Sequence, residues 1–499
     1  MRSDEIMKMT ALQAGKAIRE GEVTSAEITR AALDSIEREN PALNAYIEVF
    51  KDLALEKAEA AQKKIRAGEL YSPLAGVPFA LKDNICTEGL RTTCGSRMLA
   101  GFVPPYSATV VHRLEASGAV MVGKTNLDEF CMGSTSETSF FGPVKNPWDT
   151  TRVPGGSSGG SAASVAAGMT FYAYGSDTGG SIRQPCSFCG ISGIKPTYGS
   201  VSRFGLIAYA SSLDQIGPLG RDILDCAAAL NQIAGKDPMD QTTNHSSPID
   251  LEEARTFRGK SLKIGVPEDY FGEGLDPDVE ARVREAASTF TELGATVLPI
   301  RLPIVEYAIP TYYIIACAEA CSNLSRYDGI KYGYRAKDAG NLAEIYIQSR
   351  SEGFGLEVKR RIMLGNYVLS SGYYDAYYIK ALQSKALIKK AFDDAFSSCD
   401  LIIGPTAPST APRIGESLSD PLRMYLGDIY TVLPNIVGLP SASIPCGFDT
   451  KGLPVGLQLI GPYGSEQLMV GAAALFQRST SHHLRFPGDR PGQGGGDQP

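Results

Sequence analysis

Two serines and one lysine are the residues of this sequence best suited to covalent chemistry. Ser157 and Ser181 lie in a block, residues 154–196, that is crowded with Gly, Ser and Ala, and Lys82 stands 75 residues before Ser157 in the segment GVPFALKDN. A serine hydroxyl becomes a good nucleophile only when a base removes its proton, and that base is usually a histidine. None of the four histidines of the chain falls in the block, so another base is required.

Lysine can replace histidine when burial disfavours its charged form. Burial lowers the pKa of a lysine from about 10.4 towards roughly 7 or 8, where the neutral amine can accept a proton. Lys82 follows the apolar run of residues 77–81 and is therefore the candidate base. Ser181 ends the sequence TGGS, whose glycines can adopt the positive φ angles that backbone anion sites need, so an oxyanion hole is expected there.

These residues resemble the amidase signature family, whose catalytic unit is a lysine, a bridging serine held by a cis peptide and a nucleophilic serine. The resemblance assigns the lysine to Lys82, the bridging serine to Ser157 in PGGSSGGS, and the nucleophile to Ser181 in SDTGGSIRQP, 24 residues further on. All three positions hold the required residue type. A Gly/Ser-rich loop that only turns the chain is the alternative, but it would leave the lysine motif unexplained.

The resemblance also implies an oxyanion hole beside the nucleophile. Its donors would be the backbone N–H groups of Thr178, Gly179, Gly180 and Ser181. Fixed donors of this kind stabilise the negative charge that develops on the substrate oxygen, which is usually a large contribution to catalysis. Ser158 would supply a supporting hydroxyl next to the catalytic residues.

Three segments outside the block are similar to one branch of this family, the glutaminase subunits of tRNA-dependent amidotransferases. They are residues 310–333, 357–378 and 424–445, and the similarity covers roughly residues 4–480. It implies that the substrate is free glutamine, whose carboxylate and ammonium groups need one fixed positive and one fixed negative partner.

The residues implied as glutamine ligands are Arg361 for the α-carboxylate, Asp428 for the α-ammonium group, and Tyr312 nearby. Arginine suits the first role because it can bind a carboxylate through two parallel hydrogen bonds. Arg360 and Tyr313 adjoin these positions, and the sequence leaves them open as alternatives.

The reaction implied by the resemblance is hydrolysis of glutamine by a Ser-cisSer-Lys mechanism. The ammonia would convert Glu-tRNA(Gln) to Gln-tRNA(Gln), or Asp-tRNA(Asn) to Asn-tRNA(Asn) in some organisms. This chain would need no cofactor, whereas a kinase and transferase partner, the B subunit, would use ATP and Mg²⁺, and a small C subunit would complete a heterotrimer. With a net charge of −7 and no long basic run, the chain is expected to leave tRNA binding mainly to its partner.

Three other functions compete with this interpretation. A stand-alone amidase of small amides would use the same catalytic residues, and a non-enzymatic assembly protein would keep the fold without the chemistry. Residues 118–125, GAVMVGKT, match the literal pattern of a nucleotide-binding P-loop. However, a P-loop needs a strand before its first glycine, whereas a helix over residues 107–117 and then a strand are predicted here.

The alternation of short apolar runs with helical segments favours the α/β class. The predicted strands are residues 77–81, 119–122, 262–266, 401–403 and 455–460, and the predicted helices include 25–39, 52–67 and 281–293. We expect a single large α/β/α sandwich with a mixed central sheet over residues 1–485, with the signature core at about 72–220. Residues 235–260 are the best internal linker, and the Gly/Pro-rich residues 486–499 are expected to form a flexible tail.

Other features of the sequence exclude several classes of protein. The charged N-terminus has no apolar signal region, so a cytoplasmic protein is expected. Residues 153–176 carry no charge, but their glycines and serines would make a poor membrane span, and we interpret them as the buried floor of the site. Among ten cysteines the only CxxC pair is Cys186 and Cys189, which favours free thiols over disulfides or a metal.

Overall fold

The computed structural model describes residues 2–488, and its centre is one mixed sheet of eleven strands in the order β1-β3-β2-β4-β6-β5-β10-β11-β9-β7-β8. The strands are β1 Tyr46–Val49, β2 Pro78–Lys82, β3 Val120–Thr125, β4 Tyr172–Asp177, β5 Ser192–Lys195, β6 Gln215–Gly220, β7 Lys263–Pro267, β8 Thr296–Ile300, β9 Leu401–Pro405, β10 Ser441–Phe448 and β11 Pro454–Ile460. Parallel pairing joins β2 to β3 and β4, and β7 to β8 and β9, while the strands between these groups pair antiparallel. The predicted mixed α/β sheet is therefore confirmed.

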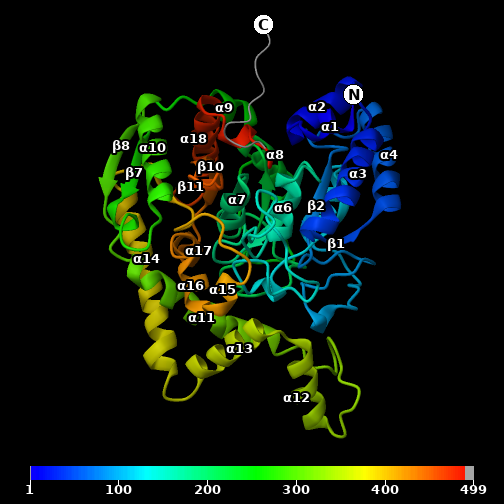
Figure 1. Ribbon diagram of the computed structural model, residues 1–499, viewed down its shortest axis with the longest axis vertical. Helices are drawn as coiled ribbons and strands as arrows, with labels where there is room; N and C mark the ends of the chain where they lie inside the picture. Colours follow the sequence, from blue (N-terminus) through cyan, green and yellow to red (C-terminus); the bar gives the residue numbers. More distant parts are fainter. Residues whose placement is uncertain (1, 489–499) are drawn as a thin grey trace.

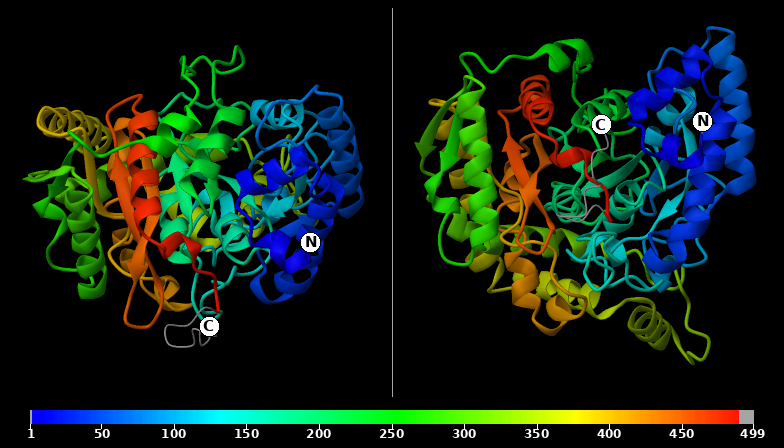
Figure 2. Two further views of the ribbon diagram at one scale, coloured as in Figure 1. Left: turned by 90° about the horizontal axis from the view of Figure 1, so that it is seen from above. Right: turned by 45° about the horizontal axis from the view of Figure 1, so that its top comes forward.

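Helices enclose this sheet (Figures 1 and 2). They are α1 Ser3–Met7, α2 Ala11–Glu20, α3 Ser25–Leu43, α4 Lys51–Arg66, α5 Thr109–Ala116, α6 Gly159–Ala166, α7 Arg183–Cys189, α8 Ile223–Ile233, α9 Leu251–Thr256, α10 Pro277–Glu292, α11 Ala308–Leu324, α12 Leu342–Gly353, α13 Leu356–Leu369, α14 Lys380–Phe396, α15 Glu416–Ser419, α16 Pro421–Leu426, α17 Val432–Val437 and α18 Glu466–Ser479. Helices α6 and α7, which follow the two serines of the block, pack on the central strands β4 and β11.

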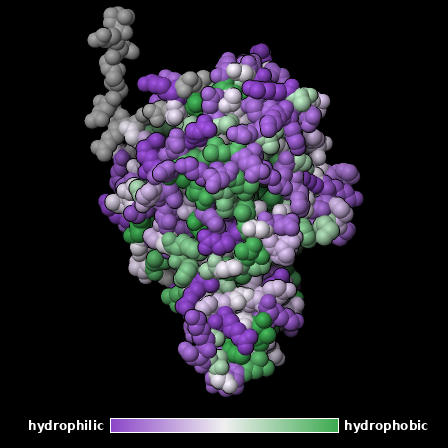
Figure 3. All heavy atoms as spheres, turned by 90° about the vertical axis from the view of Figure 1, so that its right-hand side faces the viewer, coloured by the Kyte–Doolittle hydropathy of each residue, from purple (hydrophilic) through white to green (hydrophobic). Residues whose placement is uncertain are grey.

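The helical segment from α11 to α14 lies along one end of the sheet, at the bottom of Figure 1. Helix α13 packs along α11, while α12 projects away from the body. Figure 3 shows this projection as the lower lobe of the molecule, with hydrophobic residues among hydrophilic ones. Leu342 and Ile347 of α12 are among its exposed apolar side chains.

Most local predictions agree with the structure, but two boundaries differ. The helix predicted over residues 25–39 continues through Pro41 to Leu43, because a proline this close to the end of a helix removes only one backbone hydrogen bond and little of the helix follows it. The linker predicted at residues 235–260 contains a short helix, α9, whose first turn is capped by the side chain of Asp250.

Three further expectations concern the P-loop pattern, the cysteines and the tail. Residues 120–125 form β3, so the P-loop pattern holds a strand as predicted, but Gly123 lies within that strand and does not follow it. Lys124 makes a fully buried ion pair with Asp83 at 3.0 Å. All ten cysteines are free thiols. Within residues 2–488 no helix is both long and apolar enough to span a membrane. Of the predicted tail, residues 489–499 lie outside the described residues.

Candidate active site

Two parallel strands and one helix bring the predicted catalytic residues together. Lys82 is the last residue of β2, and β4, its parallel neighbour, ends at Asp177 and leads into the loop of residues 178–181. The carboxyl ends of parallel strands meet at the same edge of a sheet, which is where ligand sites form in α/β proteins. Ser157 reaches this edge because it lies just before α6, which packs on β4.

Lys82 is fully buried among hydroxyl groups. Its Nζ donates hydrogen bonds to Ser157 Oγ at 2.7 Å, Ser158 Oγ at 2.9 Å and Ser176 Oγ at 3.0 Å. Among the described residues, no carboxylate forms an ion pair with Lys82. The amine therefore contacts neutral oxygens only, an arrangement in which a proton can pass between nitrogen and a serine hydroxyl without breaking an ion pair.

The backbone around Ser157 is held from both sides. The peptide bond between Gly156 and Ser157 is cis, as the family resemblance implied. Gly156 N–H donates to Gln184 Oε1 at 3.0 Å, and a Cβ at Gly156 would lie 2.0 Å from Asp128 Oδ2. Only glycine fits at this position, because the buried Asp128 carboxylate occupies the space of a side chain.

Ser181 lies beside Ser157 without sharing a side-chain hydrogen bond with it. The Ser181 carbonyl accepts from Ser158 N–H at 3.0 Å, and the residue keeps 7% of its surface exposed. Its hydroxyl donates to no described residue and accepts from none. The structure thus brings all three predicted catalytic residues to one place, with the Lys82–Ser157 hydrogen bond formed and the Ser181 hydroxyl uncommitted.

The four predicted oxyanion donors are not equivalent. Gly180 N–H already donates to Asp177 Oδ1 at 2.8 Å, so it is not free to bind a substrate oxygen. The N–H groups of Gly179 and Ser181 donate to no described residue. The Thr178 hydroxyl donates to Asp214 Oδ1 at 2.7 Å, which anchors the start of the loop. The structure therefore removes Gly180 from the predicted set of donors.

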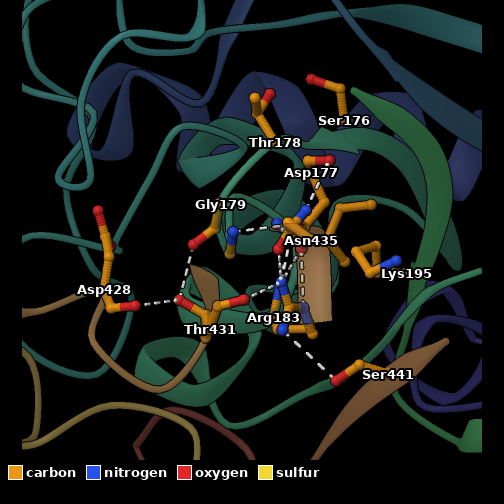
Figure 4. Close-up of polar contacts among 12 residues, drawn as sticks. Ser176, Asp177, Thr178, Gly179, Arg183, Lys195, Asp428, Thr431, Asn435 and Ser441 are labelled. Atoms are coloured by element: carbon orange, nitrogen blue, oxygen red, sulfur yellow. Dashed lines mark hydrogen bonds and ion pairs between the residues drawn. The ribbon is translucent and has the colours of Figure 1, made fainter. Parts of the chain in front are cut away.

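A buried ion pair between Asp177 and Arg183 holds the loop of residues 178–181 in place (Figure 4). Arg183 donates through Nη2 to Asp177 Oδ1 at 2.9 Å and through Nε to Oδ2 at 3.0 Å, and both residues are fully buried. Although burial raises the pKa of Asp177, the charge and hydrogen bonds of Arg183 hold it well below its usual range. The Asp177 carboxylate also accepts the N–H groups of Gly180 and Ile182, so the ion pair determines how the loop backbone is oriented.

Thr431 connects the same loop to a distant part of the chain. Its hydroxyl donates to the Gly179 carbonyl at 2.7 Å and also lies 3.1 Å from the Asp428 carbonyl, and its own carbonyl accepts from Arg183 (Figure 4). Sequence reasoning missed Asp177, Arg183 and Thr431. The first two offered a signal, because they are charged residues within an apolar and small-residue block and had to be paired once buried.

Arg361, on the buried face of α13, has one nitrogen without a partner. Its Nε donates to Glu357 Oε1 at 2.8 Å and its Nη1 to Tyr209 Oη at 2.8 Å, whereas Nη2 is buried and finds no acceptor among the described residues. Arg360 also contacts Glu357, but its side chain is 39% exposed. A buried guanidinium with a free N–H group is suited to receive an anion, which favours Arg361 over its neighbour.

Aromatic rings and a second charged group surround this guanidinium. The rings of Tyr209, Tyr313 and Tyr425 lie 5.5, 5.1 and 5.7 Å from the Arg361 guanidinium carbon. Tyr313 also donates to Asp428 Oδ2 at 3.2 Å, so one ring contacts both charged residues.

Asp428 is buried and accepts from Ser134 Oγ at 2.7 Å. Burial raises the pKa of its carboxyl to about 7, against the lowering effects of Ser134, Arg361 and Tyr313. Tyr312, the tyrosine named from the sequence, lies against the catalytic loop instead, because a Cβ at Gly179 would be 2.6 Å from its hydroxyl. The structure therefore places both tyrosines in the site, with different neighbours.

With this geometry established, comparison with known proteins identifies the family. A family model described as Amidase matches residues 27–470. The chain belongs to the amidase family. The membership predicted from the lysine and serine motifs is confirmed, and the chain is an enzyme of this amidase group.

Individual members of the amidase family align over nearly the whole chain. The A subunit of the glutamyl-tRNA(Gln) amidotransferase of Agathobacter rectalis is 58% identical over 475 residues, which cover 95% of this chain and 94% of that protein. The crystal structure of the corresponding amidotransferase protein from Thermotoga maritima has a TM-score of 0.78 and 39% identity, covering 98% and 97% of the two chains. The peptide amidase of Stenotrophomonas maltophilia has the same TM-score, 0.78, with 31% identity over 94% and 96%.

Proposed function

We propose that this protein is the glutaminase subunit of a glutamyl-tRNA(Gln) amidotransferase. The observation that carries the proposal is the pair of buried, oppositely charged residues Arg361 and Asp428 joined by Tyr313, next to the loop of Ser181. A free amino acid carries one carboxylate and one ammonium group, so it requires such a pair, whereas a simple amide requires neither. The high identity to proteins of that name supports the same conclusion.

In the proposed complex the α-carboxylate of glutamine accepts from Arg361 Nη2 and the α-ammonium group donates to Asp428. Tyr312 would line the space between these groups and the catalytic loop. Two fixed contacts at one end of the substrate hold the side-chain amide at the other end against Ser181, which lowers the entropic cost of reaching the transition state.

The catalytic residues then act in sequence. Lys82 Nζ takes the proton of Ser157, and Ser157 takes the proton of Ser181 as Ser181 Oγ attacks the amide carbon. The oxyanion is stabilised by the N–H groups of Gly179 and Ser181, together with that of Thr178. Ser157 returns a proton to the departing ammonia, a glutamyl ester remains on Ser181, and water hydrolyses the ester by the reverse path. Ser158 holds Lys82 in place.

The partners follow from the same proposal. The ammonia is consumed by a kinase and transferase partner that uses ATP and Mg²⁺, and a small third protein completes the heterotrimer in the cytoplasm. The tRNA binds mainly to the kinase and transferase partner. Residues 1–485 would act as one amidase signature domain with a tail at 486–499. The residues that the structure describes contain no cluster of side chains arranged to hold a metal ion.

The test is ammonia release from glutamine by the complete assembly, with ATP and misacylated tRNA. We expect Ser181→Ala and Lys82→Ala to abolish release, and Ser164→Ala, which removes a buried hydroxyl of the same block that donates to the Ser161 carbonyl, to preserve it. The alternative is a stand-alone amidase. Absence of glutamine turnover in the assembly, with turnover of another amide by the chain alone, would favour that alternative.

A further inference from the structure

We infer that Glu129 is a positioning residue. By capping helix α13 from another part of the chain, it holds Arg361 in the position that binds the glutamine carboxylate. This inference rests on the proposed function, because it concerns binding of the glutamine carboxylate. Glu129 belongs to η2, Glu129–Cys131, a short turn next to the catalytic core and far from α13 in the sequence. Its carboxylate accepts Gly355 N–H at 2.8 Å and Ser96 O–H at 2.5 Å.

Helix α13 lacks a cap of its own. Its N-cap residue is Gly355, which has no side chain to accept a backbone N–H group, and Val358 occupies the third position, where Glu or Gln would otherwise reach back to the N-cap. Glu129 supplies that missing acceptor from another part of the chain. A carboxylate at this end of the helix also opposes the positive end of the helix dipole.

The close fit at this contact depends on glycine. A Cβ added at Gly355 would lie 2.3 Å from Glu129 Oε2, so any other residue would displace the carboxylate or the helix. The next residue, Phe130, packs against Tyr327 and Phe354 with ring centroids 5.1 and 5.6 Å away. Polar and apolar contacts therefore fix the start of α13 to η2.

Burying the Glu129 carboxylate at this position costs free energy. Glu129 is 3% exposed, and burial raises its pKa to about 7 against the lowering effects of Ser96, Gly355 and Lys359. A buried charge is kept only where its partners compensate for lost solvation. The compensating partner of Glu129 is the start of α13 at Gly355. The same helix carries Glu357 and Arg361, which follow Gly355 by two and six residues.

The consequence is specific to one end of the substrate. Arg361 Nη2 must lie within hydrogen-bonding distance of the glutamine carboxylate. A shift or fraying of the first turn of α13 would move Nη2 out of that distance. Lys82, Ser157 and Ser181 lie on other elements and do not depend on α13. Loss of the Glu129 contact should therefore weaken glutamine binding and leave the catalytic step intact.

The test compares Glu129→Ala with Asp225→Ala in the complete assembly. Asp225 is a matched control because it is also buried and caps a helix from outside, accepting the N–H groups of Ala11 and Leu12 at the start of α2, away from the site. Both substitutions should lower the Tm. Only Glu129→Ala should raise the KM for glutamine, by about tenfold for a lost cap, with kcat within threefold.

Two further measurements separate positioning from general damage. Hydrolysis of 4-aminobutanamide, which is glutamine without its α-carboxylate, should keep its kcat/KM in Glu129→Ala. Glu129→Gln keeps an acceptor and should restore the KM to within threefold of wild type. If Glu129→Ala does not fold, Gly355→Ala perturbs the same contact from the helix side and should raise the KM in the same way.

The outcomes distinguish this inference from the proposed function. Wild-type assembly without glutamine turnover would overturn the function itself. Normal wild-type turnover with an unchanged KM in Glu129→Ala, or an equal rise in Asp225→Ala, would overturn only the role of Glu129. An equal loss with both substrates would also contradict it.

Discussion

Replacing Arg361 by lysine should weaken the use of glutamine while preserving the fold. Lysine keeps a positive charge beside Glu357, so that buried carboxylate does not lose one of its two cationic partners, as it would with an uncharged residue. In the planar guanidinium of Arg361, Nε and Nη1 bind Glu357 and Tyr209 while Nη2 stays free, and an ammonium group cannot reproduce this arrangement. The change therefore removes the contact to the substrate more than it disturbs the protein.

The size of the effect follows from the hydrogen bond that is lost. A hydrogen bond to a charged group contributes about 1.5–3 kcal/mol, which corresponds to a fall in kcat/KM for glutamine of roughly 10- to 150-fold. The half-exposed Arg360 is the matched control, and Arg360→Lys should stay within threefold of wild type.

The assay is ammonia release from glutamine and from 4-aminobutanamide by the complete assembly. Arg361→Lys should lose activity on glutamine and keep it on the amide that lacks the carboxylate. Equal losses from Arg361→Lys and Arg360→Lys, or an equal loss on both substrates, would refute the assignment of the carboxylate to Arg361.

Two other predictions concern the acidic ligand and the catalytic loop. The pKa of Asp428 is raised to about 7, mainly by burial, so its carboxylate loses its charge as the pH falls through 7. The kcat/KM for glutamine should then fall about tenfold per pH unit relative to that for glutaramic acid, which lacks the ammonium group. A constant ratio of these two kcat/KM values from pH 8 to 5.5 would contradict this. Gly180→Ala should lower kcat about 100-fold or more, because its φ is +127° and a Cβ would lie 2.2 Å from Thr431 Oγ1. Gly272→Ala, with open space around it, should have no effect, and retention of full activity by Gly180→Ala would refute the proposed role of the loop.

The sequence predicted those parts of the site that local motifs encode. Lys82, Ser157 and Ser181 could be found because each lies in a recognisable segment and the strand pattern predicted buried neighbours around them. Thr431 could not be found in this way, because it meets the catalytic loop from 252 residues away and no local pattern connects the two segments. Glu129 was missed for the same reason, since its partner Gly355 lies 226 residues further on.

The unequal oxyanion donors show what such reasoning leaves undetermined. The sequence TGGS offers four consecutive N–H groups, and only the folded chain shows that Asp177 takes that of Gly180. Backbone donors compete for acceptors within the protein, and a buried carboxylate accepts several of them. Motif recognition therefore proposes four candidate donors, and the hydrogen bond from Gly180 to Asp177 reduces the number that are free.

The site divides into two parts that are built from different regions of the fold. The lysine and serines lie on β2, the segment just before α6 and the loop after β4, all supported by the central sheet. The groups proposed to recognise the amino acid come from α11, α13 and the turn before α17. Because these elements are separate, the recognition groups can differ between relatives while the catalytic core stays the same.

That division also specifies where coupling between binding and catalysis must occur. In the described structure, the Thr431 hydroxyl donates to the Gly179 carbonyl at 2.7 Å and lies 3.1 Å from the Asp428 carbonyl, so a shift of Asp428 towards an ammonium group would reach the oxyanion loop through this one hydroxyl. Glutamine that is bound correctly at its α-carbon would thereby hold Gly179 in the orientation that the transition state requires. Binding energy from the α-ammonium group would then appear in kcat as well as in KM, which is how an enzyme favours its own substrate over an amide that lacks this group.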